Sequence, residues 1–155
     1  MDTTPATPED AAGITPVDDP IAARRQRLDE VVASGEQPYR SRWDVSTSVL
    51  EIRTAHDSLE PGEETDVSVS IAGRLMARRD QGKVAFFVLR DGTGEVQLFC
   101  RKDAMGEEAF DQVIAHDLGD WLGVRGTVLR TRRGELSVSP SEVVLLSKSL
   151  RPLPE

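Results

Sequence analysis

Apolar and polar residues alternate along much of the chain from residue 66 onward, and this period of two predicts β-strands. The alternation occupies three runs, at residues 66–77, 84–89 and 95–100. Short segments rich in Asp and Gly, at 80–82 and 91–94, separate these runs and are typical of turns. The pattern therefore predicts three consecutive strands joined by tight turns.

The pattern after residue 101 predicts a helix and two more strands. Asp103 can cap a helix that carries apolar residues on one side, namely Met105, Phe110, Val113 and Ile114. We expect strand four at 121–131, a hairpin at 132–134, and strand five at 135–139, with Pro140 at a strand end or bulge and an edge segment at 143–146. Three strands, a helix and a hairpin is the order of a mainly β, five-stranded Greek-key barrel of the OB type, although SH3-like barrels give similar strings.

The N-terminal part of the chain has a different pattern. Asp19 and Pro20 predict the start of a helix that runs to about Ser34, with Gly35 as its C-cap. A second helix is expected at 47–59, capped by Ser48 with Glu51. We divide the chain into an acidic disordered tail (1–18), an N-terminal helical extension (19–65), the barrel (66–147) and a linker (148–155).

The first of these helices has two distinct faces. Its apolar stripe is narrow and consists of Ile21, Leu28, Val31 and Val32. Arg24, Arg25 and Arg27 form another face, which could be simply solvated or could touch phosphates.

An aromatic ring and an amide are expected on the outer face of the barrel. Two alternating apolar sets are expected to face the core, namely Ala85, Phe87 and Leu89 in one strand and Val96, Leu98 and Cys100 in the next. With that orientation, Phe86 and Gln97 point outward. A strand shifted by one residue would instead bury Phe86. An exposed ring beside an amide, among arginines, is typical of a face that stacks bases and reads their edges.

Other polar residues extend this candidate nucleic-acid site. Glu135 alternates with apolar neighbours and should face outward, where it would accept a hydrogen bond from a base or remain a solvated hairpin residue. The candidate phosphate contacts are Arg78 and Lys83, with Arg74 and Arg132 nearby. Exposed basic residues are common, so a purely solvated role for them is equally open.

Charge and composition narrow the possible functions. The 155-residue chain has a net charge of −8, but residues 1–20 hold five acidic and no basic residues, whereas residues 71–103 hold seven basic and four acidic ones. Locally the predicted strands are therefore positive. The single cysteine, Cys100, excludes a disulfide framework, and His56 and His116 lack neighbours for metal binding or catalysis. Without a candidate membrane span or signal peptide, we expect a cytoplasmic location.

Four stretches of the sequence carry a family resemblance. They are RLDEVVASGEQPY, GRLMARRDQGKVAFFVLRDGTGEVQLFCRKD, DLGDWLGVRGTVLRTRRGELSV and LLSKSLRPLPE. Together they resemble the N-terminal anticodon-binding domain of class II lysyl-tRNA synthetases, over residues 24–155. The resemblance implies that an aromatic on strand two stacks on the central uridine of the anticodon and that a glutamine and a glutamate help to read it. These roles fall on Phe86, Gln97 and Glu135. The family usually has a small hydroxyl residue or an alanine–serine pair before the stacking aromatic, whereas this chain has Val84 and Ala85 there and a second aromatic residue, Phe87, after it.

The same resemblance implies what this chain lacks. The class II motifs that bind ATP, Mg²⁺, lysine and the acceptor end belong to a catalytic domain that would begin after Glu155, so we expect no cofactor and no catalytic residues here. The expected partner is the anticodon loop of lysine tRNA, with a homodimer possible. The chain would be either a fragment of a lysine–tRNA ligase or a freestanding paralogue of its first domain. Two alternatives are a sequence-tolerant single-strand binder and a protein-interaction domain.

Overall fold

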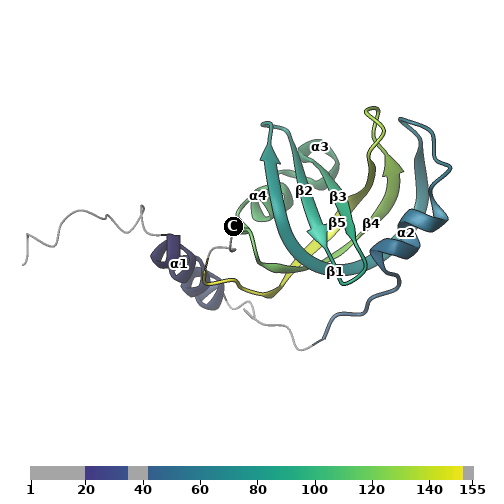
Figure 1. The fold of residues 1–155 in the computed structure, drawn as a ribbon. Helices are drawn as coiled ribbons and strands as arrows, with labels where there is room; N and C mark the ends of the chain where they lie inside the picture. The colour runs from purple at the N-terminus through teal and green to yellow at the C-terminus, as the bar shows by residue number, and fades with distance from the viewer. Residues whose placement is uncertain (1–19, 35–41, 152–155) are drawn as a thin grey trace, which may run out of the picture.

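The computed structural model describes residues 20–34 and 42–151, and its centre is a five-stranded closed barrel (Figure 1). Neighbouring strands follow the order β1-β2-β3-β5-β4 around the barrel. The pairing is antiparallel except between β3 and β5, which close the barrel through two parallel register pairs, Gln97 with Ser137 and Leu98 with Val138. The predicted OB-type barrel is confirmed. Its strands are β1 (Glu64–Asp80), β2 (Val84–Arg90), β3 (Glu95–Arg101), β4 (Trp121–Arg130) and β5 (Leu136–Ser147).

Alternating burial along β2 and β3 fixes which side chains face the core. Phe87 is 1% exposed and Leu98 is fully buried, whereas Phe86 and Gln97 are only half-buried on the opposite face. The interpretation with Phe86 pointing outward is therefore correct, and the one-residue shift is excluded. Cys100 lies in the same core, where burial raises the pKa of its thiol to about 12, so this side chain stays protonated.

Strands β1 and β5 are longer than their sequence patterns predicted. The N-terminal half of β1 pairs with β4 and its C-terminal half pairs with β2, so one strand serves two sides of the barrel. β5 continues through Pro140, and the pairing with β4 skips Ser141 between Glu142 and Pro140. Pro140 thus lies at a bulge, as predicted, and the expected edge segment is the second half of the same strand.

Two short helices, α3 (Lys102–Met105) and α4 (Glu107–Ile114), connect β3 to β4. A single helix was predicted here, but Gly106 with φ +89° interrupts it, and Asp103 lies inside α3 instead of capping it. The predicted apolar side is confirmed, because Phe110 and Val113 are buried in the barrel core.

Helix α2 (Val49–Ala55) is fastened to the turn between β2 and β3. Ser48 accepts a hydrogen bond from the N–H of Glu51 at 3.1 Å, which confirms the predicted cap, and Ile52 is buried against the barrel. The N–H groups of the first two helical residues donate to the carboxylate of Asp91 and the hydroxyl of Thr93. Burial acts to raise the pKa of Asp91, but these and neighbouring hydrogen bonds outweigh it, so the pKa lies below its ordinary value.

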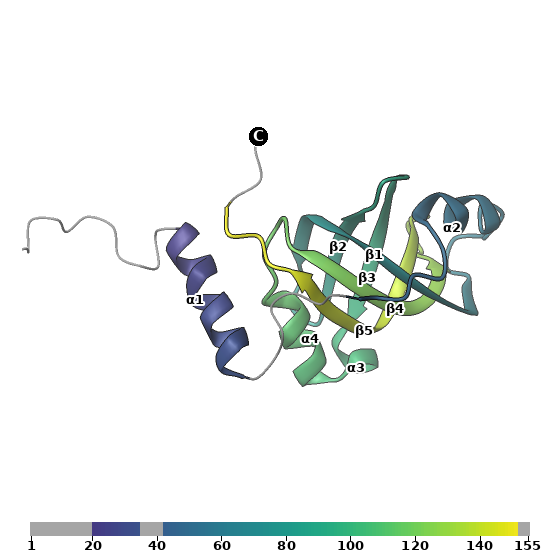
Figure 2. The same ribbon diagram turned by 90° about the horizontal axis from the view of Figure 1, so that it is seen from below.

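Helix α1 (Pro20–Ala33) lies beside the barrel, near α4 and the C-terminal segment (Figure 2). The predicted caps Asp19 and Gly35 lie outside the described residues. Only part of the expected apolar stripe docks this helix: Val31 is partly buried against the core, whereas Ile21 and Val32 are exposed. Its most buried residue is Arg24, which is 7% exposed.

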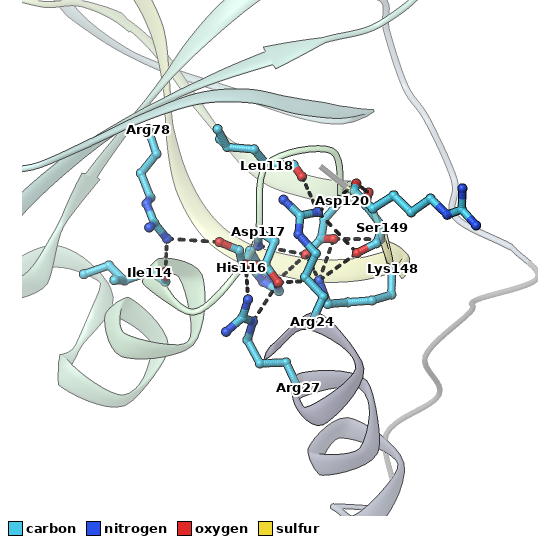
Figure 3. A network of polar contacts seen from close by, with 11 residues as sticks. Arg24, Arg27, Arg78, Ile114, His116, Asp117, Leu118, Asp120, Lys148 and Ser149 are labelled. Carbon is cyan, nitrogen blue, oxygen red and sulfur yellow. Dashed lines mark hydrogen bonds and ion pairs between the residues drawn. The ribbon is translucent and has the colours of Figure 1, made fainter. Parts of the chain in front are cut away.

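Polar contacts attach α1 to the barrel (Figure 3). The guanidinium of Arg24 donates to the backbone carbonyls of Leu118, Ser149 and Arg151 at 2.8–3.3 Å. Arg27 donates to both carboxylate oxygens of Asp117, at 2.6 and 2.7 Å. Arg24 is therefore buried and bonded, and Arg27, whose side chain is 36% exposed, is engaged by Asp117, so neither guanidinium is free for a phosphate.

A buried lysine completes this region, which we call the junction (Arg24, Arg27, Asp117, Asp120 and Lys148). The ammonium of Lys148 lies 2.6 Å from the carboxylate of Asp117 and 2.9 Å from that of Asp120, which is fully buried. The carboxylate of Asp120 also accepts the N–H groups of Asp117 and Ser149. Residues 148–151, expected to begin a linker, are thus held against the barrel.

Candidate nucleic-acid interface

An open pocket of about 690 Å³ lies on the outer face of the barrel, over β2, β3 and the β4–β5 hairpin. Its wall combines rings, guanidinium groups and carboxylates. The lining side chains are Glu64, Arg79, Phe86, Gln97, Phe99, Arg101, Leu129, Arg130, Thr131, Arg132, Arg133 and Glu135. Five arginines face two glutamates, and this local excess of three positive charges favours a polyanion although the whole chain is acidic.

A row of side chains crosses three strands inside this pocket. Arg79 of β1 is in register with Phe86 of β2, which is in register with Phe99 of β3. The two ring centroids are 5.2 Å apart with an interplanar angle of 19°, and the Arg79 guanidinium carbon lies 4.8 Å from the Phe86 centroid. Arg101 covers Phe99 in the same way, at 5.0 Å. We call these four residues the stacking row, since rings and planar cations in this arrangement can receive a nucleobase.

Gln97 lies two residues before Phe99 and therefore on the same face of β3. Among the described residues its side-chain amide has no hydrogen-bond partner, so its donor and acceptor groups are available to a ligand in the pocket.

The β4–β5 hairpin supplies Glu135 at the rim. Gly134, with φ +90°, makes the turn, and the Thr131 hydroxyl accepts the N–H of Glu135 at 3.1 Å. The Glu135 side chain is 52% exposed, and one carboxylate oxygen lies 3.7 Å from a guanidinium nitrogen of Arg53 in α2. Phe86, Gln97, Glu135 and Arg132 are thus brought together in one pocket, as the sequence predicted.

The other three predicted contacts do not line this pocket. Arg78 donates to the carbonyls of Ile114 and His116, at 2.6 and 3.1 Å, because it points away from the face that carries Arg79 (Figure 3). Arg74 donates to the carbonyl of Gly119 at 3.3 Å. Lys83 is exposed in the turn between β1 and β2, outside the pocket lining.

Sequence reasoning missed the remaining ring and several of the arginines that line the pocket. These are Arg79, Phe99, Arg101 and Arg130. The strand period could have identified Phe99, since it shares the face of Gln97. The Nε groups of Arg101 and Arg130 are buried without a hydrogen-bond partner among the described residues.

Among the residues that the structure describes, no group of three or more His, Cys, Asp or Glu side chains could hold a metal ion. No helix in the same part of the chain is long and apolar enough to cross a membrane.

Comparison with known proteins relates this chain to a family. Residues 69–146 match the family described as OB-fold nucleic acid binding domain, of the tRNA anticodon type. A lysine–tRNA ligase of a Synechococcus species is 50% identical over 133 residues, which are 85% of this chain and 26% of that protein. The lysine–tRNA ligase of Listeria monocytogenes is 43% identical over 141 residues, or 90% of this chain and 28% of that protein. The chain thus spans about a quarter of the length of these relatives. It belongs to the OB-fold nucleic-acid-binding family, as an anticodon-binding domain of the lysyl-tRNA ligase type.

Proposed function

We propose that this domain binds the anticodon loop of lysine tRNA by stacking a base on Phe86 and reading its edge with Gln97 and Glu135. The observation that carries the proposal is the pocket in which these three side chains meet within an excess of positive charge. The choice of lysine tRNA is supported by relatives that are lysine–tRNA ligases at 43–50% identity.

Stacking on Phe86 requires a rearrangement of the stacking row. Phe99 lies against one face of the Phe86 ring, and the Arg79 guanidinium lies over the ring as well. A cation–π contact at an exposed site contributes about 0.5–1 kcal/mol, whereas stacking of a base on an aromatic side chain contributes about 1–3 kcal/mol. The base therefore displaces the guanidinium of Arg79, which remains close enough to contact the RNA.

The two polar groups give the site a preference among bases. Uracil presents an N–H at position 3 between two carbonyl oxygens, so a carboxylate can accept from the N–H while an amide donates to an oxygen. Cytosine has an acceptor at position 3, which would face the negative carboxylate. Gln97 and Glu135 therefore favour uridine at the stacked position.

Arg132 and Arg133 lie in the hairpin at the pocket and contact the phosphates of the loop. The aminoacylation chemistry, with its ATP and Mg²⁺, belongs to the part of the relatives that this chain does not span. The domain by itself then selects the tRNA and does not form lysyl-adenylate.

The test is binding of anticodon stem-loop RNAs that carry uridine or cytidine at the central anticodon position, measured by fluorescence anisotropy. Phe86→Ala should weaken binding of the uridine RNA by about 1–3 kcal/mol, or about 5- to 150-fold. Phe86→Trp is the matched control, since it keeps a stacking surface and should bind within a few-fold of the native protein.

Three outcomes of this experiment argue against the proposal. Unchanged affinity in a folded Phe86→Ala variant would reject the stacking role. Equal affinity for both RNAs would make the domain a sequence-tolerant single-strand binder. A native protein that binds a protein partner but neither RNA would be an interaction domain.

A further inference from the structure

Arg53 in helix α2 connects the first residue of β3 with the rim of the pocket. Its Nε donates to the backbone carbonyl of Glu95 at 2.7 Å, and its terminal nitrogen lies 3.7 Å from the carboxylate of Glu135. We propose that Arg53 is a positioning residue that holds the Glu135 carboxylate in the orientation needed to read a base. This inference rests on the proposed function and extends it to a helix outside the barrel.

The helix that carries Arg53 is rigidly mounted. Its first two N–H groups are bound by Asp91 and Thr93, and its apolar residues Val49 and Ile52 are 0% and 2% exposed. Because the hydrogen bond to Glu95 fixes the Arg53 guanidinium at its Nε, the terminal nitrogens are directed toward the hairpin. Arg53 is thus held by α2 and β3 together, and not by Glu135 alone.

The turn that follows α2 supports the same hairpin. Arg130 donates to the carbonyl of Gly134 at 2.7 Å and to the carbonyl of Asp57, just after α2, at 3.5 Å. The N–H of Gly62 donates to the carbonyl of Arg130 at 3.0 Å. The backbone on which Glu135 sits is therefore braced from the side where Arg53 reaches its carboxylate.

Charge gives Arg53 a second effect on Glu135. A carboxylate among RNA phosphates is repelled, and its side chain here is half-exposed and able to turn toward water. The nearby guanidinium offsets part of that repulsion and favours one rotamer of the carboxylate. Arg53 does not itself line the pocket, so its influence on RNA is transmitted through Glu135.

The experiment is a double-mutant cycle with Arg53→Gln, Glu135→Gln and the double variant in the full 155-residue chain. The measured quantity is the ratio of dissociation constants for the cytidine and uridine stem-loops described above. Arg53→Gln should reduce this ratio by about 2- to 5-fold, because a half-exposed ion pair is weak. In the Glu135→Gln background, Arg53→Gln should leave the ratio unchanged.

The matched control is Arg25→Gln, which removes one positive charge from an exposed position on α1. It should lower the affinity for both RNAs slightly and equally, without changing their ratio. Urea unfolding of each variant checks that α2 remains docked.

Two results would overturn the inference while leaving the proposed function standing. One is an unchanged ratio in Arg53→Gln when the native protein discriminates. The other is an equal effect of Arg53→Gln with and without Glu135, which would make Arg53 a direct RNA contact. If the native protein does not discriminate or bind, the proposed function itself fails.

Discussion

The junction under α1 and the pocket on β2 and β3 are both rich in arginine and carboxylate, yet they differ in how those charges are satisfied. In the junction, Arg24 and Lys148 are each 7% exposed and Asp120 is fully buried. Arg24 donates to backbone carbonyls and Lys148 donates to the carboxylates of Asp117 and Asp120, over 2.6–3.3 Å. In the pocket, Arg79 contacts a ring, Gln97 has no partner among the described residues, and Glu135 is half-exposed.

This difference separates charges that maintain the fold from charges available to a ligand. Removing one member of a buried, fully hydrogen-bonded ion pair destabilises the protein strongly, because the charge of the other member is left uncompensated. An exposed guanidinium contributes little to folding and keeps its donors for a partner. The binding surface is therefore identified by exposed polar groups whose hydrogen bonds are not satisfied within the protein, and not by residue type.

The largest expected effect comes from breaking the junction. Asp120→Ala removes one of the two carboxylates that pair with the buried ammonium of Lys148 and leaves only that of Asp117. This change should lower the free energy of unfolding, measured in urea titrations, by about 3–5 kcal/mol. RNA affinity of the folded fraction should be unchanged. Asp111→Ala, an exposed carboxylate on α4, is the control and should change stability by no more than about 0.5 kcal/mol. A loss below 1 kcal/mol for Asp120→Ala, on the scale of ordinary surface substitutions, would contradict the comparison.

A substitution in the pocket is expected to have a smaller effect, and this effect is on RNA binding and not on stability. Arg132→Gln should leave stability within about 0.5 kcal/mol of the native value but reduce the slope of log affinity against log salt concentration by about 1, because one phosphate contact is lost. Arg24→Gln should instead lower stability and leave the salt slope unchanged, since the Arg24 guanidinium donates to three backbone carbonyls within the protein. The measurements are urea unfolding and RNA titration at several salt concentrations. The comparison fails if both variants lower the salt slope equally.

The smallest expected effect concerns His116, which lies beside the junction. Burial lowers its pKa below the ordinary 6.5, with Lys148 adding to the shift and Asp120 and Asp117 opposing it. As the pH falls from 7 to 5, the unfolded chain takes up a proton at this imidazole before the native protein does, so stability decreases.

His116→Gln should remove that part of the pH dependence, measured as the difference in urea midpoint between pH 7 and pH 5. The carboxylate of Asp117 does not confuse the result. Burial acts to raise its pKa, but hydrogen bonds from Arg27 and Lys148 prevail and hold it below the ordinary 3.8, well under this range. An identical loss of stability in the native protein and in His116→Gln would show that burial of the imidazole is unimportant.

The sequence pattern predicted the barrel and the centre of the pocket because a period of two is a local property. In the run from 84 to 89, alternation assigned Phe87 to the core and Phe86 to the outer face, and the same reasoning placed Gln97. The outward position of Glu135 followed from its alternation with the apolar Leu136 and Val138.

Features that depend on distant parts of the chain could not be predicted in this way. Arg24 finds its acceptors 94 to 127 residues away, so its burial leaves no mark on the helix sequence. Arg78 and Arg79 are adjacent and identical, and only the register of β1 against β2 shows that the second one faces the pocket. The break at Gly106 is different, since it is local: a glycine with positive φ commonly ends a helix, and this residue could have been recognised as the end of α3.

The closure of the barrel gives the pocket a mechanical role. β3 and β5 are held by two register pairs, and Gln97 belongs to one of them. An RNA loop that contacts both Gln97 and Glu135 would add a link between β3 and the start of β5, the two neighbouring strands that share the fewest register pairs. Its arrival should then slow amide hydrogen exchange along β3 and β5 more than elsewhere, so that recognition of the ligand also tightens the protein that recognises it.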